Sequence, residues 1–225
     1  MEENLIKIKK NIQIACEKTG RKLEDIQIIA VTKTIQLDVL QQNLPMFLNH
    51  GITVFGENRV QEMLEKQPNI KDIQWHMIGN LQRNKVKYIV DKVTMIHSLD
   101  SLKLAAEINR ISQREGVIMD TLIEVNIAGE DSKHGVAPDQ VISLAKECLE
   151  LSNVKIKGLM TVAPYVDDPE DNRVHFQNMY DLSQKLRKIA PEADQISMGM
   201  TGDYAVAIEQ GATMVRIGTG IFGER

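Results

Sequence analysis

The stretch 26–33 reads IQIIAVTK, and it decides between the two common architectures of a parallel sheet. The run Ile26–Thr32 is mostly apolar and β-branched, which is typical of a strand buried on both faces. An open doubly wound sheet normally places a glycine-rich phosphate loop directly after its first strand. Here Lys33 follows instead, so this stretch favours a closed barrel.

Seven more short apolar runs follow in the same style. They are Ile52–Phe55, Ile73–Ile78, Val93–His97, Asp120–Asn126, Val154–Met160, Gln195–Met198 and Thr213–Ile217. The segments between them repeat apolar residues at helical spacing, and these faces hold Val60, Met63 and Leu64; Val86, Ile89 and Val90; Leu102, Ala105 and Ala106; Val141, Leu144, Ala145 and Cys148; Met179, Leu182, Leu186 and Ile189. Alternating strands and helices indicate a parallel sheet. Eight units of about 28 residues approach the size of a TIM-type (β/α)₈ barrel. No linker composition interrupts the chain, so we expect one α/β domain over residues 1–225.

Three local signals refine this expectation. Apolar residues at 5, 8, 12 and 15 predict an N-terminal helix that ends near Gly20. Because almost nothing follows the eighth run, we expect that extra helix to take the place of the last barrel helix. Pro45 predicts a break in the helix after the first strand. Asp168 and Pro169 predict an N-cap and a first-turn proline.

Composition limits the function classes. The 225 residues include 27 basic and 31 acidic side chains, a net charge of −4, which argues against a nucleic-acid coat. Cys16 and Cys148 form no CxxC pair, so a disulfide framework is not expected and a reducing compartment fits. We find no signal-peptide pattern and no apolar run long enough to span a membrane. We therefore expect a cytoplasmic protein, and a monomer because no obvious apolar patch stands out.

The chemically distinctive residues fall at the predicted carboxyl ends of the strands, where barrels hold their active sites. Lys33 is the most informative of them. Partial desolvation at a barrel mouth favours the neutral amine, which is a nucleophile toward a carbonyl. The alternative is a strand-end lysine whose ammonium simply reaches solvent.

The last two strand ends resemble a phosphate site, which in such barrels often follows strands seven and eight. Ser197 and Thr219 offer hydroxyls there, and four glycines allow close approach of backbone N–H groups to an anion: Gly199, Gly202, Gly218 and Gly220. The alternative is that these glycines only make tight turns. The segment 218–223 also fits GxGxxG, but the helix, second strand and acidic residue of a dinucleotide fold cannot follow it.

Arg216 lies two residues before Gly218, so both are expected to face the barrel interior. An inward arginine needs an acceptor, which is either a ligand atom or the partner of a structural salt bridge. The five histidines show no HxxxH or HExxH spacing, so no metal is expected. His76 and His97 end different strands and are able to meet.

Eight motifs in order resemble those of the pyridoxal phosphate homeostasis proteins. They are AVTKT (30–34), FGENRVQE (55–62), WHMIGNLQRNK (75–85), HSLDS (97–101), EVNIAGEDSKHG (124–135), GLMTVAP (158–164), ISMGMTGDYAVAIEQG (196–211) and VRIGTGIFG (215–223). The resemblance covers essentially the whole chain. It implies the fold-type III barrel of alanine racemases, pyridoxal 5′-phosphate (PLP) as cofactor, and a role in vitamin B6 balance.

The resemblance also implies roles for individual residues. Lys33 would hold PLP as a Schiff base, and Arg216 would face the pyridine nitrogen. Ser197, Gly218 and Thr219 would hold the phosphate, with Met198 and Gly199 nearby. Asn58 and His76 would lie around the ring at the mouth.

Three functions compete at this stage. The first is a PLP carrier or regulator that meets PLP-dependent apo-enzymes transiently. The second is a PLP-dependent amino-acid racemase or decarboxylase. The third is a class I aldolase. Racemases of this type take a tyrosine base from a further domain, and two-sided proton transfer needs two bases. Here Tyr165 and Tyr204 are the nearest replacements. The sequence therefore favours the carrier.

Overall fold

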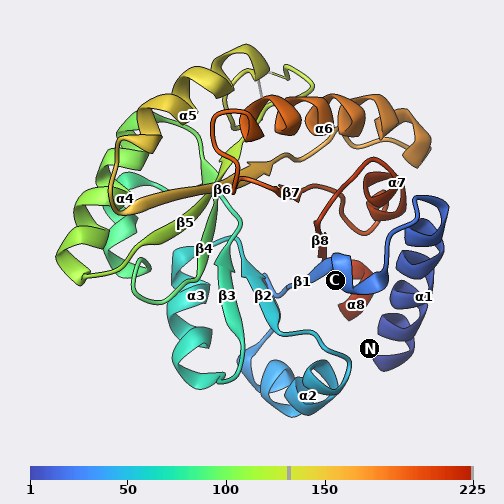
Figure 1. Ribbon diagram of the computed structural model, residues 1–225. Helices are drawn as coiled ribbons and strands as arrows, with labels where there is room; N and C mark the ends of the chain where they lie inside the picture. Colours follow the sequence, from blue (N-terminus) through green and yellow to red (C-terminus); the bar gives the residue numbers. More distant parts are fainter. Residues whose placement is uncertain (131–132, 224–225) are drawn as a thin grey trace.

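The computed structural model describes residues 1–130 and 133–223 as a closed barrel of eight parallel strands (Figure 1). The strands are β1 (Gln27–Val31), β2 (Val54–Glu57), β3 (Gln74–Met77), β4 (Met95–Leu99), β5 (Met119–Glu124), β6 (Val154–Met160), β7 (Gln195–Ser197) and β8 (Met214–Ile217). Each pairs with its neighbours in chain order, and β8 closes the ring on β1. The predicted barrel and all eight predicted runs are thereby confirmed. Asp131 and Ser132, inside the motif at 124–135, lie outside the described residues.

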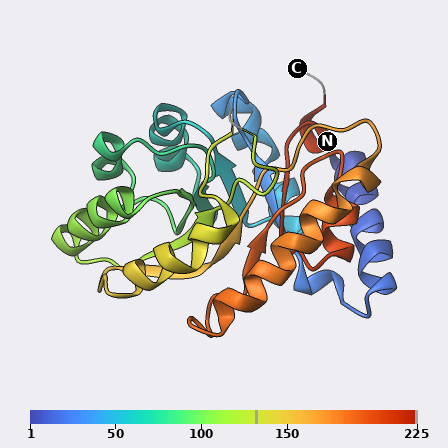
Figure 2. The ribbon, with the colours of Figure 1, turned by 90° about the horizontal axis from the view of Figure 1, so that it is seen from above.

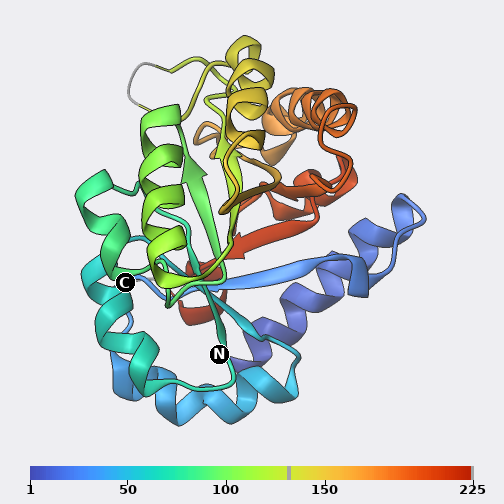
Figure 3. The same ribbon diagram turned by 60° about the vertical axis from the view of Figure 1, so that its left-hand side comes forward.

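Helices cover the outside of this ring (Figure 2). They are α1 (Glu2–Lys18), α2 (Leu37–Asn49), α3 (Val60–Lys66), α4 (Leu102–Glu115), α5 (Val141–Leu149), α6 (Arg173–Arg187), α7 (Tyr204–Glu209) and α8 (Thr219–Phe222). Short 3₁₀ turns join them: η1 (Leu23–Asp25), η2 (Gln67–Asn69), η3 (Arg83–Tyr88), η4 (Pro138–Gln140) and η5 (Pro169–Asn172). From α4 to α7 consecutive helices lie side by side, as α4 and α5 do in Figure 3.

The apolar core has two layers, because successive strand residues face opposite sides of the sheet. The larger layer lies between the strands and the helices. The smaller layer fills the barrel interior with Ile29, Val54, Met95, Leu122, Met160 and Met214. Buried polar residues, among them His76, His97, Ser197 and Arg216, also lie inside the barrel.

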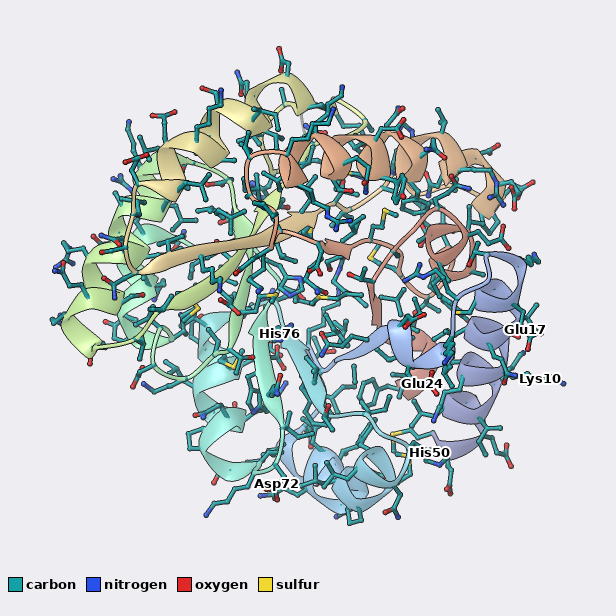
Figure 4. All side chains as sticks on the ribbon, in the orientation of Figure 1. Lys10, Glu17, Glu24, His50, Asp72 and His76 are labelled. Carbon is teal, nitrogen blue, oxygen red and sulfur yellow. The ribbon has the colours of Figure 1, made fainter. Side chains whose placement is uncertain are left out.

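The N-terminal helix occupies the place predicted for it. Within the described residues only the four-residue α8 follows β8, and α1 packs against α7 and α8. Asn4 Nδ2 donates to the Ile221 carbonyl at 3.1 Å. The labelled Lys10 and Glu17 lie on the outer face of α1 (Figure 4).

Two helix predictions are wrong. Pro45 lies inside an unbroken α2. Proline has no N–H to donate to the Gln41 carbonyl, but both residues are on the exposed face of the helix, so that carbonyl remains next to solvent. The segment around Val86 forms the 3₁₀ helix η3 rather than an α-helix. The predicted cap at Asp168 is confirmed, since its carboxylate accepts from the Glu170 N–H at 3.0 Å, although the 3₁₀ turn η5 precedes α6.

Candidate functional site

A cavity of about 720 Å³ opens at the carboxyl ends of the strands. This mouth cavity has the volume usual for small-molecule sites. Five of the predicted site residues line it: Lys33, Asn58, Arg216, Gly218 and Thr219. They come from the ends of β1, β2 and β8, so closure of the barrel brings together positions up to 186 residues apart in the sequence.

Lys33 lies on a tight turn just beyond β1. The Ile35 N–H donates to the Thr32 carbonyl at 3.0 Å, and Thr34 has a positive φ of 64°. Val31 and Lys33 line the mouth cavity, while Thr32 between them is fully buried and faces the opposite side. The side chain of Lys33 is exposed, so the expected desolvation of its amine is wrong for this structure.

Arg216 is the buried cation of the site. It is 4% exposed and donates to Ser197 Oγ at 2.6 Å and to the Thr161 carbonyl at 2.7 Å. Burial lowers its pKa to about 10, against the opposing charges of Glu124 and Asp203. With a pKa of about 10, Arg216 keeps its charge at pH 7. Both of its hydrogen-bond acceptors are neutral, so its positive charge is not paired by them, and it has further N–H donors for the cavity that it lines.

A chain of buried hydrogen bonds continues from Arg216 through the barrel interior. His97 Nδ1 lies 3.1 Å from Ser197 Oγ, and His97 Nε2 lies 3.0 Å from His76 Nδ1. Burial lowers the pKa of His76 to about 4 and holds that of His97 well below its usual value, so both rings are neutral at pH 7. The two histidines meet as the sequence suggested, and they orient the Ser197 hydroxyl beneath Arg216.

His76 therefore does not lie at the mouth. It is 3% exposed among the strands (Figure 4) and lines a second cavity of about 700 Å³ at their amino ends, beside Gln27 and Gln74. The placement around the PLP ring that the resemblance implied for His76 does not match this position. The reason is register: His76 pairs with Gly56 and Met95, one residue short of the end of β3.

Three residues expected near the phosphate lie off the cavity lining. Ser197 and Met198 are fully buried, and Ser197 is occupied by Arg216 and His97. Gly199 has a φ of +88°, and a Cβ there would lie 2.6 Å from Ala207 Cβ. The absence of a side chain at Gly199 therefore allows α7 to pack closely against the loop.

Thr201 lines the mouth cavity and was missed as a site residue. Its Oγ1 accepts from the Gly220 N–H at 3.1 Å and lies 3.3 Å from Thr219 Oγ1. These contacts join the loop after β7 to the loop after β8. The signal was present in the MGMTGD stretch (198–203), because Thr201 is its one hydroxyl-bearing residue and lies beyond the strand end.

Two amides at the mouth carry unused acceptors. Asn172 donates to Asp203 Oδ2 and to the Pro164 carbonyl, both at 3.0 Å. Asn172 Oδ1 and Asn58 Oδ1 are buried and have no hydrogen-bond partner among the described residues. Buried polar atoms of this kind call for a partner, and both side chains line the cavity. The amides therefore favour a polar ligand.

Glu124 at the end of β5 is a further buried titratable group that the sequence did not single out. Burial, and then the charge of Asp100, raise its pKa to about 7, whereas Arg216 opposes the shift. Its Oε2 has no hydrogen-bond partner in the described part of the chain.

The two tyrosines considered as bases differ in position. Tyr165 lines the rim of the mouth cavity and is 95% exposed. Tyr204 is buried, and its hydroxyl accepts from Asn11 Nδ2 of α1 at 3.2 Å. Tyr204 therefore fastens α1 to the barrel instead of facing the cavity.

Two features are absent from residues 1–130 and 133–223. No group of three His, Cys, Asp or Glu side chains is arranged to hold a metal ion. None of the helices there is long and apolar enough to cross a membrane.

Comparison with known proteins agrees with this barrel. The family model for the alanine racemase N-terminal domain matches residues 4–225. The pyridoxal phosphate homeostasis protein of Aquifex aeolicus is 46% identical over 99% of this chain and 97% of its own, and that of Homo sapiens is 36% identical over 97% and 84%. PipY of Synechococcus elongatus, solved with PLP bound, superposes with a TM-score of 0.80 at 29% identity, covering 95% of this chain and 99% of PipY.

The fold and the family model define the class, the PLP-type barrels that form the N-terminal domain of alanine racemases. A solved alanine racemase from Clostridium difficile shares this fold at 18% identity, with a TM-score of 0.76 over 99% of this chain and 56% of the racemase. Within that class, the chain belongs to the family of pyridoxal phosphate homeostasis proteins.

Proposed function

We propose that this protein binds PLP in the mouth cavity, covalently at Lys33, and serves PLP homeostasis as a carrier instead of turning over a substrate. One observation carries the proposal. An exposed lysine amine, a buried arginine and two hydroxyl- and glycine-bearing loops line a single cavity of about 720 Å³. The PLP-bound relative PipY supports the choice of ligand.

The residues present fit this cofactor. Thr201, Gly202, Gly218 and Thr219 provide small and hydroxyl-bearing positions suited to a phosphate, and Thr201 takes the place first given to Ser197. Arg216 presents a cationic donor to a ring nitrogen. The unpartnered Asn58 Oδ1 is free to accept from a ring substituent.

The chain's own groups divide the work of binding. Lys33 would supply the amine that condenses with the aldehyde of the cofactor, with loss of one water molecule, and its exposed position would let water reverse this bond. Arg216 fixes the ring, held in turn by Ser197 and the Thr161 carbonyl. Met198 and Gly199 shape the loop from behind, and His76 contributes only through His97 and Ser197.

The carrier role rests on two groups that a racemase needs and that the described residues do not supply: a proton donor that keeps the ring nitrogen protonated, and a positioned second base. When bound, PLP supplies an electron sink, which works best with a protonated ring nitrogen. Arg216 keeps its charge and only donates, so it leaves that nitrogen without a proton. Tyr165 is almost fully exposed and Tyr204 is tied to α1, so neither is held as a second base.

Borohydride reduction followed by peptide mapping tests the binding proposal. The pyridoxyl label is expected on the peptide that contains Lys33, and Lys33→Ala should abolish it. Lys92→Ala, a surface lysine paired with Asp91, is the matched control and should label normally. A label that persists in Lys33→Ala would overturn the assignment.

Deuterium exchange tests the carrier proposal. The PLP-bound protein is incubated with L-alanine in deuterated water, and the α-proton signal is followed by NMR. We expect no exchange, or very slow exchange. Loss of the signal at about 1 s⁻¹ or faster would establish the racemase alternative.

The remaining parts of the proposal concern the setting of the protein. We propose that it is a cytoplasmic monomer, and that PLP-dependent apo-enzymes receive the cofactor in transient encounters. The exposed mouth and the exchangeable position of Lys33 support such a transfer. Sedimentation velocity that reports a stable dimer would contradict the monomer.

A further inference from the structure

A buried ion cluster lies directly behind the Lys33 turn, on the side of the barrel wall away from the mouth. Lys66 of α3 and Glu57 of β2 have side chains 4% and 0% exposed, and Lys66 Nζ lies 2.7 Å from Glu57 Oε1. Lys66 Nζ also lies 3.2 Å from Glu62 Oε2. Glu62 stands one helical turn before Lys66, on the same face of α3. We call Glu57, Glu62 and Lys66 the α3 clamp.

The clamp holds the backbone on both sides of Lys33. Lys66 Nζ donates to the Thr32 carbonyl at 2.8 Å, and the Thr32 hydroxyl donates to Glu57 Oε1 at 2.6 Å. On the other side, the Thr34 N–H donates to Glu62 Oε2 at 2.7 Å. Thr32, before Lys33, is therefore tied to Lys66 and Glu57, and Thr34, after Lys33, is tied to Glu62.

The turn between these two attachments is strained. Thr34 has a φ of +64°, a left-handed conformation that a β-branched residue rarely adopts. Such a conformation persists only where surrounding contacts enforce it. Two contacts hold this turn: its own bond from the Ile35 N–H to the Thr32 carbonyl, and the bond from the Thr34 N–H to the Glu62 carboxylate, which is charge-assisted and therefore strong.

The alternation of side chains along the strand explains how the bonds to Thr32 and Thr34 orient Lys33. Side chains alternate between the two faces of a strand, and Thr32 faces the clamp while Val31 and Lys33 line the mouth. Fixing Thr32 outward and Thr34 in its left-handed conformation leaves the amine of Lys33 directed into the cavity.

A stabilising role alone does not account for this arrangement. A buried ion pair contributes little net stability compared with apolar packing, because its groups lose their hydration. Burial raises the pKa of Glu57 in spite of Lys66, and Glu57 Oε2 finds no hydrogen-bond partner among the described residues. The cluster is thus a costly feature placed against the one turn that carries the proposed PLP lysine.

We infer that Glu57, Glu62 and Lys66 are positioning residues that set Lys33 for reaction with the PLP aldehyde. The inference rests on the proposed function, because it assigns these residues to the same PLP site. It separates two steps of ligand capture: non-covalent binding of phosphate and ring, which needs no clamp, and formation of the bond to Lys33, which does.

The test compares PLP with pyridoxamine 5′-phosphate, which has the same phosphate and ring but no aldehyde. Glu62→Ala is the main variant, because Glu62 is partly exposed and its loss leaves Lys66 paired with Glu57. We expect it to weaken PLP binding and slow Lys33 labelling at least about tenfold, the effect of one charge-assisted hydrogen bond. Affinity for pyridoxamine 5′-phosphate should change less than twofold. Glu65→Ala, an exposed neighbour on α3, should match the unaltered protein for both ligands.

A second variant tests the orientation itself. Asparagine tolerates the left-handed conformation better than threonine. Adding Thr34→Asn to Glu62→Ala should therefore restore at least half of the lost labelling on a logarithmic scale. Absence of this rescue, an equal loss of both ligands, or unchanged PLP binding in Glu62→Ala would each overturn the clamp. If the unaltered protein takes no label on Lys33, the proposed function itself fails, which is a different result.

Discussion

The structure leads us to propose Thr201, and not Ser197, as the hydroxyl that binds the phosphate of PLP, and this proposal is directly testable. Thr201 lines the mouth cavity and joins the β7 and β8 loops through Gly220 and Thr219. Ser197 is fully buried below, between Arg216 and His97. The two hydroxyls lie four residues apart in the sequence, yet we expect their removal to produce different defects.

Thr201→Ala removes a neutral donor from a charged acceptor, which costs about 1.5–3 kcal/mol. PLP affinity should therefore fall by roughly one to two decades. Pyridoxal, which lacks the phosphate, should lose almost nothing. Thr201→Ser keeps the hydroxyl and is the matched control, with affinities close to those of the unaltered protein.

Ser197→Ala leaves a buried N–H of Arg216 without its acceptor. The protein should lose about 1–3 kcal/mol of unfolding free energy, which is the cost of an unsatisfied buried donor. Because the role proposed for Arg216 is toward the ring and not the phosphate, PLP and pyridoxal should weaken by the same factor. The ratio of the two affinities therefore separates the variants.

Absorbance titration with each ligand and urea unfolding provide the measurements. The reasoning is refuted if Ser197→Ala lowers the PLP-to-pyridoxal affinity ratio more than Thr201→Ala does. It is equally refuted if Thr201→Ala weakens pyridoxal as strongly as PLP.

Three further predictions concern stability. Glu124 has its pKa raised to about 7, so the folded state binds more protons than the unfolded state between pH 4.5 and 7, and stability falls as pH rises through that range. At pH 8 the free energy of unfolding of Glu124→Gln, measured in urea, should be about 3 kcal/mol higher than that of the unaltered protein. Equal stability of the two proteins at pH 8 would contradict the buried charge. His76 has its pKa lowered to about 4 and its neighbour His97 has its pKa lowered as well, so the unfolded state binds more protons and stability falls as pH drops below 6.5. In the Glu124→Gln background His76 should contribute about 3 kcal/mol of this loss, so His76→Gln should reduce the loss measured by urea unfolding, and an unchanged loss would contradict the buried neutral ring. Phe47 is fully buried, edge-on to Phe55 with ring centroids 5.2 Å apart, so Phe47→Ala should cost about 3–5 kcal/mol, whereas the exposed Tyr180→Ala should cost far less in the same thermal unfolding assay.

The fold followed from the sequence because its signals are local. Each buried parallel strand is a short apolar run, and each covering helix repeats its apolar residues at helical spacing. These patterns are written within a few residues, so eight strands and their order were recognisable. Pro45 shows the limit of a local signal, since the packing of Leu40 and Phe47 on either side keeps α2 whole.

The sequence also placed Lys33, Arg216 and the β8 loop at one end of the barrel. Carboxyl ends of parallel strands share an edge, so the residues after each strand must gather there. This rule predicts at which end of the barrel a residue lies. It does not predict how deeply the residue is buried or whether its side chain faces the cavity. The same rule therefore placed His76 and Ser197 at the mouth.

Only the tertiary structure decided which of these side chains face the cavity. Depth depends on strand register, such as Ser197 opposite Met160 and Met214, and register is set when the barrel closes. The α3 clamp depends on contacts between β1, β2 and α3 that no periodic pattern encodes. The sequence by itself determined the barrel and the end that carries the site, and three-dimensional packing determined which side chains bind there and which hold them in place.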